Sequence, residues 1–420
     1  MIGSRPPSAF ESGDAFSSAA GLFGSTEIRS VRLRNRIIRA ATVETMAGED
    51  GEVRPSLVKL HERLAKHNVG LIITGGMYVH PRGQSTRFQT GIYADRLIDG
   101  LSAVPEAVHR QGGRIFAQLQ HSGNQSSIVK DLLSPGDRPN LLTGRKPAGR
   151  ATSDEIWEVV RSFGDAARRA VDAGFDGVHI HGANGYLISS FSSPYSNQRS
   201  DEWGGTAAKR SRFLSEVVGA VRAAVPTDYP VTLKLGLADA IPPGLQVEEA
   251  VERVVLVTDA GVDAVEVSVN LMRVPEDSAK RYVAVDRRHA RRDLIFRDVV
   301  REGTREAYFS AYTQLVRARR PDTKIILVGG LRTLPTMQEV IDKGLADFVA
   351  LSRPFIREPD LVDRLMAGDG ISAACTSCNL CLEHSGRYSL RCWREPRLRL
   401  LHSGAIKLVG KFRARRAPER

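Results

Sequence analysis

The segment VHIHGANGYL, residues 178–187, gathers side chains that could do chemistry where an apolar run ends. His179 and His181 would lie on one face of a strand, where they could share a metal ion. Alternatively, His181 and Asn184 could donate hydrogen bonds to a substrate oxygen that gains negative charge, while Tyr186 supplies a proton. A hydrogen-bonded strand end without chemistry is the third interpretation.

A metal ion at these histidines would need further ligands from other strands. The apolar runs VTLKLG (231–236) and AVEVSV (264–269) hold no histidine, and DFVALS (347–352) does not end in aspartate. We therefore favour the substrate-binding interpretation over the metal site.

Two apolar runs direct a polar side chain to the interior of a predicted sheet. In GRIFAQLQ (113–120) the strand alternation turns Gln118 inward, and in VTLKLG it turns Lys234 inward. A buried ammonium group needs a partner, because an unpaired buried charge is strongly unfavourable. Lys234 is therefore expected to meet either an anionic ligand or a strand carboxylate such as Glu266.

Two later runs end in residues that suit an anion. KIILVGG (324–330) ends in Gly329 and Gly330, and the next run is followed by Ser352 and Arg353. Glycines let backbone amides approach an anion. In (β/α)8 barrels, the loops after the last two strands often bind phosphate. These residues predict a phosphate-binding site.

The elements that must position these residues recur along the chain. Helical spacing separates the apolar runs, and Thr152 with Glu155 forms a possible capping box before the clearest helix. No GxGxxG follows the first run, so a dinucleotide-binding start has no support. The pattern predicts an α/β fold, a (β/α)8 TIM barrel with a C-terminal cysteine-containing extension. The eight runs cover residues 35–42, 69–76, 113–120, 175–182, 230–236, 263–269, 324–330 and 347–352.

The predicted domain organisation has three parts. Residues 1–20 are expected to be a poorly ordered lead-in, 21–366 the barrel, and 367–420 a cysteine cluster with a basic tail. About 50 residues separate the sixth and seventh runs, and their first half, which includes RRHARRD, is expected to form a loop near the active face.

Charge and hydropathy narrow the class of protein. Of the net charge of +12, +7 comes from residues 394–420, which hold nine Lys or Arg and two Glu. Such a tail is typical of a solvated segment, and no aromatic-interleaved basic motif indicates nucleic-acid binding. No run approaches the roughly 18 apolar residues of a membrane span, and no signal peptide is recognisable. We expect a cytoplasmic protein that acts on a small molecule.

Several segments together resemble the Old Yellow Enzyme family of FMN-dependent NAD(P)H:flavin oxidoreductases, over about residues 22–365. The resemblance rests on segments that occur in the family's order: LRNRIIRAAT, LIITGGMYVHPRG, FAQLQHSGNQ, AGFDGVHIHGANGYLISSFSSPYSNQRSDEWGG, VTLKLG, IILVGGLR and LSRPFIREPDLV.

The resemblance implies an FMN site. Gln118 would bind the pyrimidine edge of the flavin, and Lys234 would lie near N1, where reduced flavin carries its charge. Further positions implied to bind FMN are Ala41, Thr42 and Gly76 beside the flavin, and Gly329, Gly330, Ser352 and Arg353 at the phosphate.

The resemblance also implies a ping-pong reaction. NADH or NADPH would reduce FMN, whose N5 would pass hydride to the β carbon of an activated alkene. His181 and Asn184 would bind the substrate's activating oxygen, and Tyr186 would protonate the α carbon.

Three residues depart from the commonest family pattern. His179 replaces a frequent glutamate and is interpreted as an interior packing residue. Val43 stands where many members have Thr or Cys beside the flavin, and Ser352 stands where Gly is usual.

Four cysteines lie in one segment, as Cys375-x2-Cys378-x2-Cys381-x10-Cys392. Thiolates at this spacing hold iron-sulfur clusters or zinc. Larger family members that resemble 2,4-dienoyl-CoA reductase carry a 4Fe-4S cluster on a similar run, with one more residue between the second and third cysteines. They continue into a second flavin and nicotinamide domain, for which this chain is too short. A 4Fe-4S cluster, zinc and reduced thiols all stay open.

Other functions remain open besides alkene reduction. FMN-dependent amine dehydrogenation or demethylation is a neighbouring chemistry in the family. A non-redox lyase or isomerase could bind a phosphorylated substrate at Gly329 and Arg353, and an FMN-binding sensor could use the basic tail as its contact.

Overall fold

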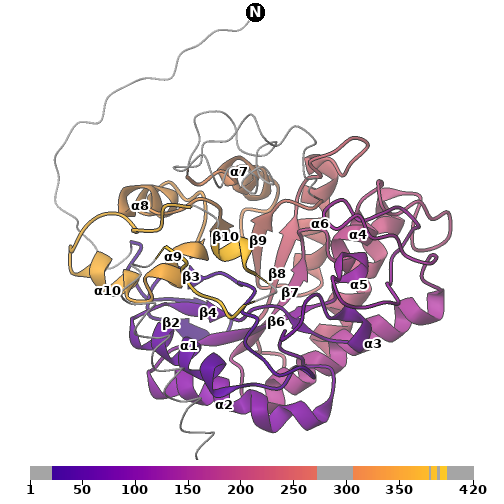
Figure 1. Ribbon diagram of the computed structural model, residues 1–420. Helices are drawn as coiled ribbons and strands as arrows, with labels where there is room; N and C mark the ends of the chain where they lie inside the picture. Colours follow the sequence, from indigo (N-terminus) through magenta and orange to yellow (C-terminus); the bar gives the residue numbers. More distant parts are fainter. Residues whose placement is uncertain (1–20, 272–305, 378–379, 386–387, 395–420) are drawn as a thin grey trace, which may run out of the picture.

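Eight parallel strands close into a barrel in the computed structural model, which describes residues 21–271, 306–377, 380–385 and 388–394 (Figure 1). Each of the eight apolar runs contains one strand, so the predicted barrel is confirmed. In order around the barrel the strands are β3 (Ile37–Arg39), β4 (Leu71–Ile73), β6 (Ile115–Gln120), β7 (Gly177–Gly182), β8 (Val231–Gly236), β9 (Ala264–Ser268), β10 (Lys324–Val328) and β11 (Phe348–Leu351), which pairs again with β3.

Helices surround the strands (Figure 1). The longest, α3 (Ser153–Asp172), buries one apolar stripe that includes Ile156, Phe163 and Ala170. The predicted capping box at its start is present, because Thr152 Oγ1 accepts from Glu155 N and Glu155 Oε2 accepts from Thr152 N. The other helices are α1 (Pro55–Lys66), α2 (Ile98–Arg110), α4 (Leu187–Ser192), α5 (Ala207–Ala223), α6 (Val247–Asp259), α7 (Ser310–Arg319), α8 (Leu334–Asp342), α9 (Arg353–Arg357), α10 (Leu361–Met366) and α11 (Leu380–Glu383).

A short hairpin that the sequence reading missed closes one end of the barrel. Strands β1 (Thr26–Ile28) and β2 (Val31–Leu33) pair antiparallel, with Arg29 at a positive φ in the turn. Ile28 and Leu33 are fully buried in one cluster with barrel residues such as Phe116. The hairpin therefore seals the amino end of the barrel and leaves the carboxyl end for a site.

A two-residue strand, β5 (Met77–Tyr78), extends the sheet beside β6. It begins directly after Gly76, at the carboxyl end of β4.

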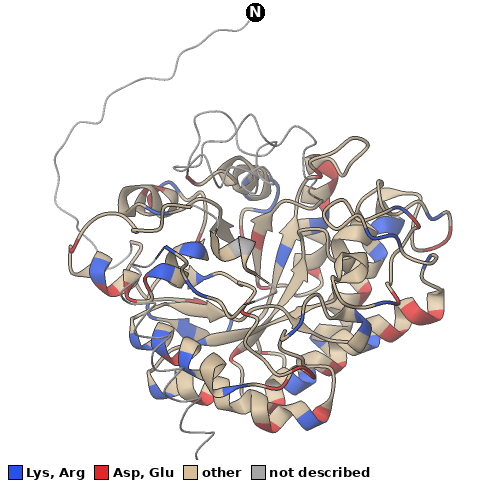
Figure 2. Ribbon diagram, in the orientation of Figure 1, with Lys and Arg blue, Asp and Glu red and all other residues tan. Residues whose placement is uncertain are grey.

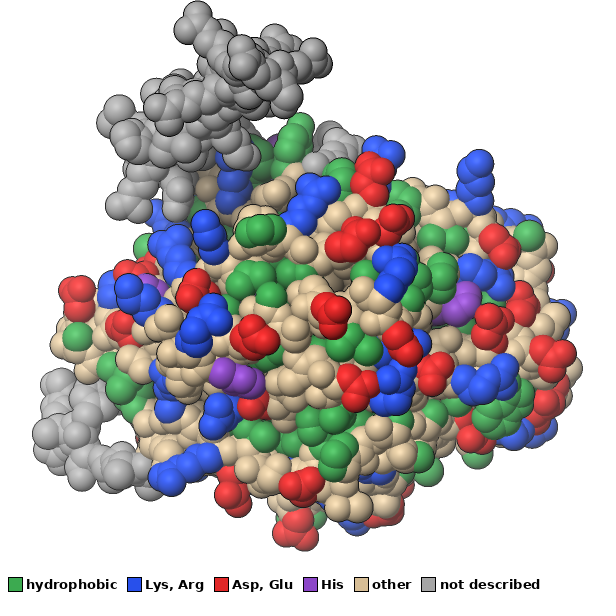
Figure 3. Space-filling view, turned by 90° about the horizontal axis from the view of Figure 1, so that it is seen from below, with side chains coloured by type: hydrophobic (Ala, Val, Ile, Leu, Met, Phe, Trp, Pro, Cys, Tyr) green, Lys and Arg blue, Asp and Glu red, His purple; other side chains and the backbone are tan. Residues whose placement is uncertain are grey.

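The outer surface is polar and mixed in charge. Lys and Arg as well as Asp and Glu are scattered over the surrounding helices (Figure 2), and both signs are interspersed with small apolar areas on the lower face (Figure 3). Among the described helices, none is long and apolar enough to cross a membrane. The predicted lead-in, the loop excursion at 272–305 and the tail from 395 lie outside the described residues.

Candidate active site

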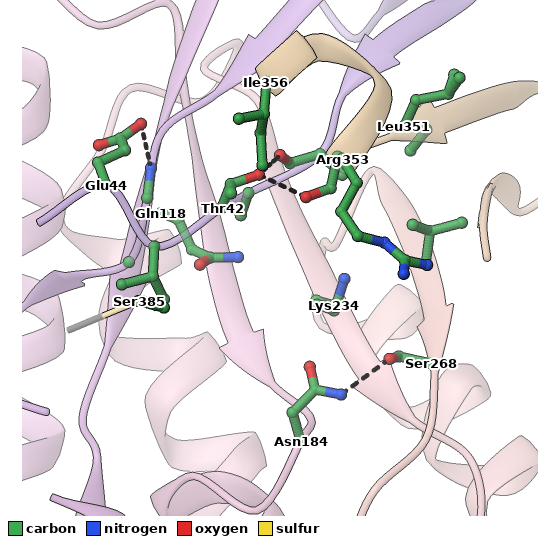
Figure 4. Close-up of a pocket in the computed structure, with 18 of the residues that line it drawn as sticks. Thr42, Glu44, Gln118, Asn184, Lys234, Ser268, Leu351, Arg353, Ile356 and Ser385 are labelled. Atoms are coloured by element: carbon green, nitrogen blue, oxygen red, sulfur yellow. Dashed lines mark hydrogen bonds between the residues drawn. The ribbon is translucent and has the colours of Figure 1, made fainter. Parts of the chain in front are cut away.

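A cavity of about 370 Å³ lies at the carboxyl ends of the barrel strands (Figure 4). This is the face on which TIM barrels carry their active sites. All the residues predicted to be catalytic or to bind the cofactor line it, namely Ala41, Thr42, Gly76, Gln118, His181, Asn184, Tyr186, Lys234, Gly329, Gly330, Ser352 and Arg353. Segments far apart in the sequence are thus brought to one space.

Gln118 presents an unsatisfied amide to this cavity. Its side chain projects inward from β6, and its Nε2 is buried without a hydrogen-bond partner in the described structure (Figure 4). Gly76 lies beside it, since a Cβ there would be 3.2 Å from Gln118 Oε1 and 2.8 Å from Gln120 Cγ. An unmet buried donor costs about 1–3 kcal/mol, so this position fits a ligand with an acceptor edge.

Lys234 enters the same space from β8 and has a buried anionic partner. Its Nζ forms an ion pair with Glu266 Oε1 on β9, which is one of the two alternatives predicted from the sequence. Lys234 still lines the cavity, and an ammonium group has three donors. The ion pair and a role toward a ligand are therefore compatible.

The Glu266 carboxylate has a second buried neighbour. Its Oε2 lies 3.2 Å from His179 Nε2, and His179 Nδ1 lies 2.8 Å from Thr232 Oγ1. Burial opposes ionisation of Glu266, but Lys234 and His179 outweigh burial and lower its pKa to about 2. His179 itself is fully buried and does not line the cavity.

His181 and Tyr186 form a second pair of cavity-lining side chains that could take part in a reaction. Their rings meet edge to face with centroids 4.7 Å apart. Burial, with the charge of Lys234 and the proximity of His179, lowers the pKa of His181 to about 3, so its imidazole is neutral at pH 7. Burial raises the pKa of the Tyr186 phenol, which a contact with Ser85 only partly offsets. Tyr186 therefore keeps its proton under ordinary conditions.

Asn184 has an orientation that the sequence could not indicate. It adopts a positive φ of 62° after β7, and its Nδ2 donates to Val269 O (3.4 Å). Nδ2 also donates to Ser268 Oγ at 3.2 Å (Figure 4). A donor toward the cavity requires the amide to turn over, after which the Ser268 hydroxyl can donate to Asn184 Oδ1.

At the end of the cavity that was predicted to bind phosphate, two glycines adopt backbone conformations that other residues rarely adopt. Gly329 and Gly330 have φ values of 125° and 74°, which favour glycine, and a Cβ on Gly329 would lie 2.6 Å from Tyr308 Cε2. Ser352 Oγ lies 2.7 Å from Thr42 Oγ1, which donates to Ala40 O. With the Thr42 hydroxyl donating to Ala40 O, the Ser352 hydroxyl would donate to Thr42 and not to an anion.

One buried carboxylate in the cavity wall was missed. Glu44 Oε1 accepts from Arg39 Nη2 (2.9 Å) and Gly75 N (3.1 Å), and His61 Nε2 lies 3.1 Å away. Burial opposes ionisation, yet His61 and Arg39 lower the pKa of Glu44 to about 2. This group ties the loop after β3 to the end of β4. The proximity of Arg39 and Glu44 at the end of the first apolar run was the available signal.

The cysteine segment also returns to the cavity, which no sequence pattern indicated. Its residues Ser377, Cys381, Ser385 and Leu390 line the wall. The segment is anchored where Leu390 N donates to Glu44 O (2.9 Å). The C-terminal extension is thus part of the site.

Three of the four cysteines line one small cavity of about 20 Å³, beside Arg353. These are Cys375, Cys381 and Cys392, and Arg357 Nη1 lies 3.9 Å from Cys392 Sγ. Cys378 lies outside the described residues. Within the described part of the chain, no three His, Cys, Asp or Glu side chains are arranged to hold a metal ion. Cys381 lines both cavities, so the two spaces are neighbours.

Comparison with known proteins identifies relatives over most of the chain. The sequence pattern of the NADH:flavin oxidoreductase / NADH oxidase family matches residues 21–369. An NADPH dehydrogenase of Geobacillus sp. is 34% identical over 340 residues, which is 80% of this chain and 91% of that protein. The NADH oxidase of Thermoanaerobacter brockii is 31% identical over 365 residues and 86% of this chain, but the match spans only 53% of that longer protein. The structure of an old yellow enzyme homologue from Zymomonas mobilis matches with a TM-score of 0.66 at 25% identity, covering 88% of this chain and 99% of that one.

Proposed function

Because the chain belongs to the NADH:flavin oxidoreductase / NADH oxidase family, we propose that it binds FMN in the 370 Å³ cavity and uses NADH or NADPH to reduce an activated carbon–carbon double bond. The observation that carries this proposal is the pairing of two groups in one cavity. The unsatisfied Gln118 amide and the Lys234 ammonium group project into the same space (Figure 4).

The residues present fit the chemistry of FMN. Gln118 Nε2 lacks an acceptor, which the pyrimidine edge of a flavin offers. Lys234 supplies positive charge where reduced flavin becomes negative, and the Gly329–Gly330 backbone with Arg353 suits the phosphate. Gly76 and the loop residues Ala41 and Thr42 supply a wall without bulky side chains. Bound FMN would supply the hydride chemistry of the reaction.

The protein's own contribution to the substrate lies at the end of β7. Neutral His181 and a turned Asn184 amide would hold the oxygen of an enone or nitroalkene, so that developing negative charge meets two donors. Tyr186, which keeps its proton, would deliver it to the α carbon. The edge-to-face contact with His181 fixes the phenol beside the oxygen-binding groups.

We further propose that the cysteines act as one unit, because three of them line the same small cavity next to Arg353. The unit would hold a 4Fe-4S cluster or zinc, or would remain as reduced thiols. Iron, zinc and acid-labile sulfide analysis of anaerobically purified protein separates the three outcomes.

The activity is tested with purified protein, NADH or NADPH, and a panel of enones and nitroalkenes, with product identification. The expected result is a saturated product with one nicotinamide consumed per double bond. If instead amines bleach the bound flavin without a nicotinamide, the enzyme is an amine dehydrogenase. A colourless protein that binds no FMN would contradict the proposal and favour a non-redox barrel enzyme.

A further inference from the structure

We propose that Glu266 and His179 are positioning residues that aim Lys234 into the cavity and offset part of its charge, and thereby set the reduction potential of the flavin. The inference rests on the proposed FMN site. Neither Glu266 nor His179 lines the cavity, so each would act only through Lys234.

The barrel register places the three groups together. Lys234 is the neighbour of Glu266 across β8 and β9, and of His181 across β7 and β8. His179 lies two residues before His181 on β7, directly beside Thr232. All the side chains face the barrel interior, and His179, Thr232 and Glu266 are fully buried. On the side away from the cavity, these buried side chains therefore shield the ion pair from solvent.

Hydrogen counting shows that two protonation states of His179 are compatible with these contacts. Thr232 has one hydroxyl hydrogen and two acceptors in reach, His179 Nδ1 at 2.8 Å and Val178 O at 3.1 Å. When Thr232 donates to Nδ1, neutral His179 carries its hydrogen on Nε2, facing Glu266 Oε2. When Thr232 donates to Val178 O, His179 carries both hydrogens and still faces Glu266 with a donor. In both states an N–H group of His179 lies 3.2 Å from Glu266 Oε2, as an ion-pair contact in which neither atom has a well-aligned hydrogen bond.

Glu266 is therefore an ionised carboxylate that contacts Lys234 without lining the cavity. Its negative charge offsets part of the positive charge that reaches the cavity. A flavin beside Lys234 therefore experiences a partly neutralised cation. Removing the negative charge of Glu266 while Lys234 remains protonated leaves a stronger positive field, which stabilises the anionic reduced flavin over the oxidised form.

The test compares the midpoint potentials of FMN bound to the wild-type protein and to Glu266→Gln, from pH 5.5 to 8. We expect the potential to become more positive in the variant at pH 5.5. The ratio of the affinities for reduced and oxidised FMN should rise at least tenfold, which is about 30 mV for a two-electron couple. The titratable groups that interact with Lys234 in the described structure include Glu266, His179 and His181.

Two further variants separate charge from structural damage. Glu249→Gln breaks another largely buried ion pair, with Arg253, away from the cavity, and should leave the potential unchanged. His179→Leu removes the donor to Glu266 Oε2 and should shift the potential in the same direction at pH 5.5, while His179→Gln, whose amide can donate, should restore it. If Glu266→Gln does not fold, the comparison of His179→Leu with His179→Gln provides the test.

The outcomes distinguish this inference from the proposed function. A protein that binds no FMN refutes the FMN site itself. Protein that binds FMN but shows an unchanged or more negative potential in Glu266→Gln and His179→Leu overturns the positioning role and leaves the FMN site intact.

Discussion

Replacing Tyr186 by phenylalanine should separate the two halves of the proposed reaction. The change removes only the phenol oxygen and keeps the ring that packs at 4.7 Å against His181, so the fold and the oxygen-binding groups should persist. Flavin reduction by the nicotinamide does not use this proton and should keep its rate within about twofold. Substrate reduction loses its acid, which typically contributes about 100-fold to 10,000-fold.

The structure indicates the lower end of that range. Tyr186 lines a cavity of about 370 Å³, so water can reach the vacated position and donate in its place. We expect a loss of about 100-fold, or roughly 3 kcal/mol in the activation barrier.

Stopped-flow absorbance measures both half-reactions, by mixing oxidised protein with NADPH or NADH and reduced protein with an enone. Tyr308→Phe is the matched control, because it removes another phenol that lines the same cavity near Gly329. Equal losses in both half-reactions of Tyr186→Phe, or no loss in either, would refute the assignment of Tyr186 as the acid.

Three further changes test the cavity and its support. Gln118→Leu removes the unsatisfied amide and should raise the FMN dissociation constant about tenfold to 100-fold, measured by flavin fluorescence; an unchanged constant would count against this contact. Gly329→Ala adds a Cβ 2.6 Å from Tyr308 Cε2 at a φ of 125° and should weaken FMN binding by about tenfold, whereas Gly344→Ala, with open space around its Cβ, should not. Because the folded-state pKa of Glu44 is lowered from 4.5 to about 2, its carboxylate stabilises the fold above pH 4.5, and that contribution is lost as the pH falls toward 2. At about 1.4 kcal/mol per pH unit this is roughly 3 kcal/mol, so Glu44→Gln should flatten the acid side of the stability profile, and an unchanged slope in thermal unfolding would contradict it.

Much of the barrel could be predicted because its strands are buried on both faces and read as short apolar runs. Each run contained a strand, and the capping box at Thr152 marked the start of α3. The hairpin β1–β2 was missed because its strands are three residues long and only Ile28 and Leu33 are fully buried. So short a pattern has no detectable period.

The site was predictable where strand alternation fixes the direction of a side chain, as for Gln118 and Lys234. It was not predictable where geometry depends on contacts between distant segments. The pairing of Lys234 with Glu266 was one of two open alternatives. The observed orientation of the Asn184 amide depends on its hydrogen bond to Ser268, at the end of β9. The return of Cys381 to the cavity wall follows from tertiary contacts of the C-terminal segment, which local sequence does not encode.

The central claim is that the cavity holds FMN that a nicotinamide can reduce. Anaerobic titration of the FMN-reconstituted protein with NADH and with NADPH, followed by its visible absorption, tests it most directly. The account predicts one FMN per chain and full bleaching of the flavin by about one equivalent of at least one nicotinamide, with reoxidation when an enone is added. Absence of bound FMN, or a bound flavin that neither nicotinamide reduces, would contradict it.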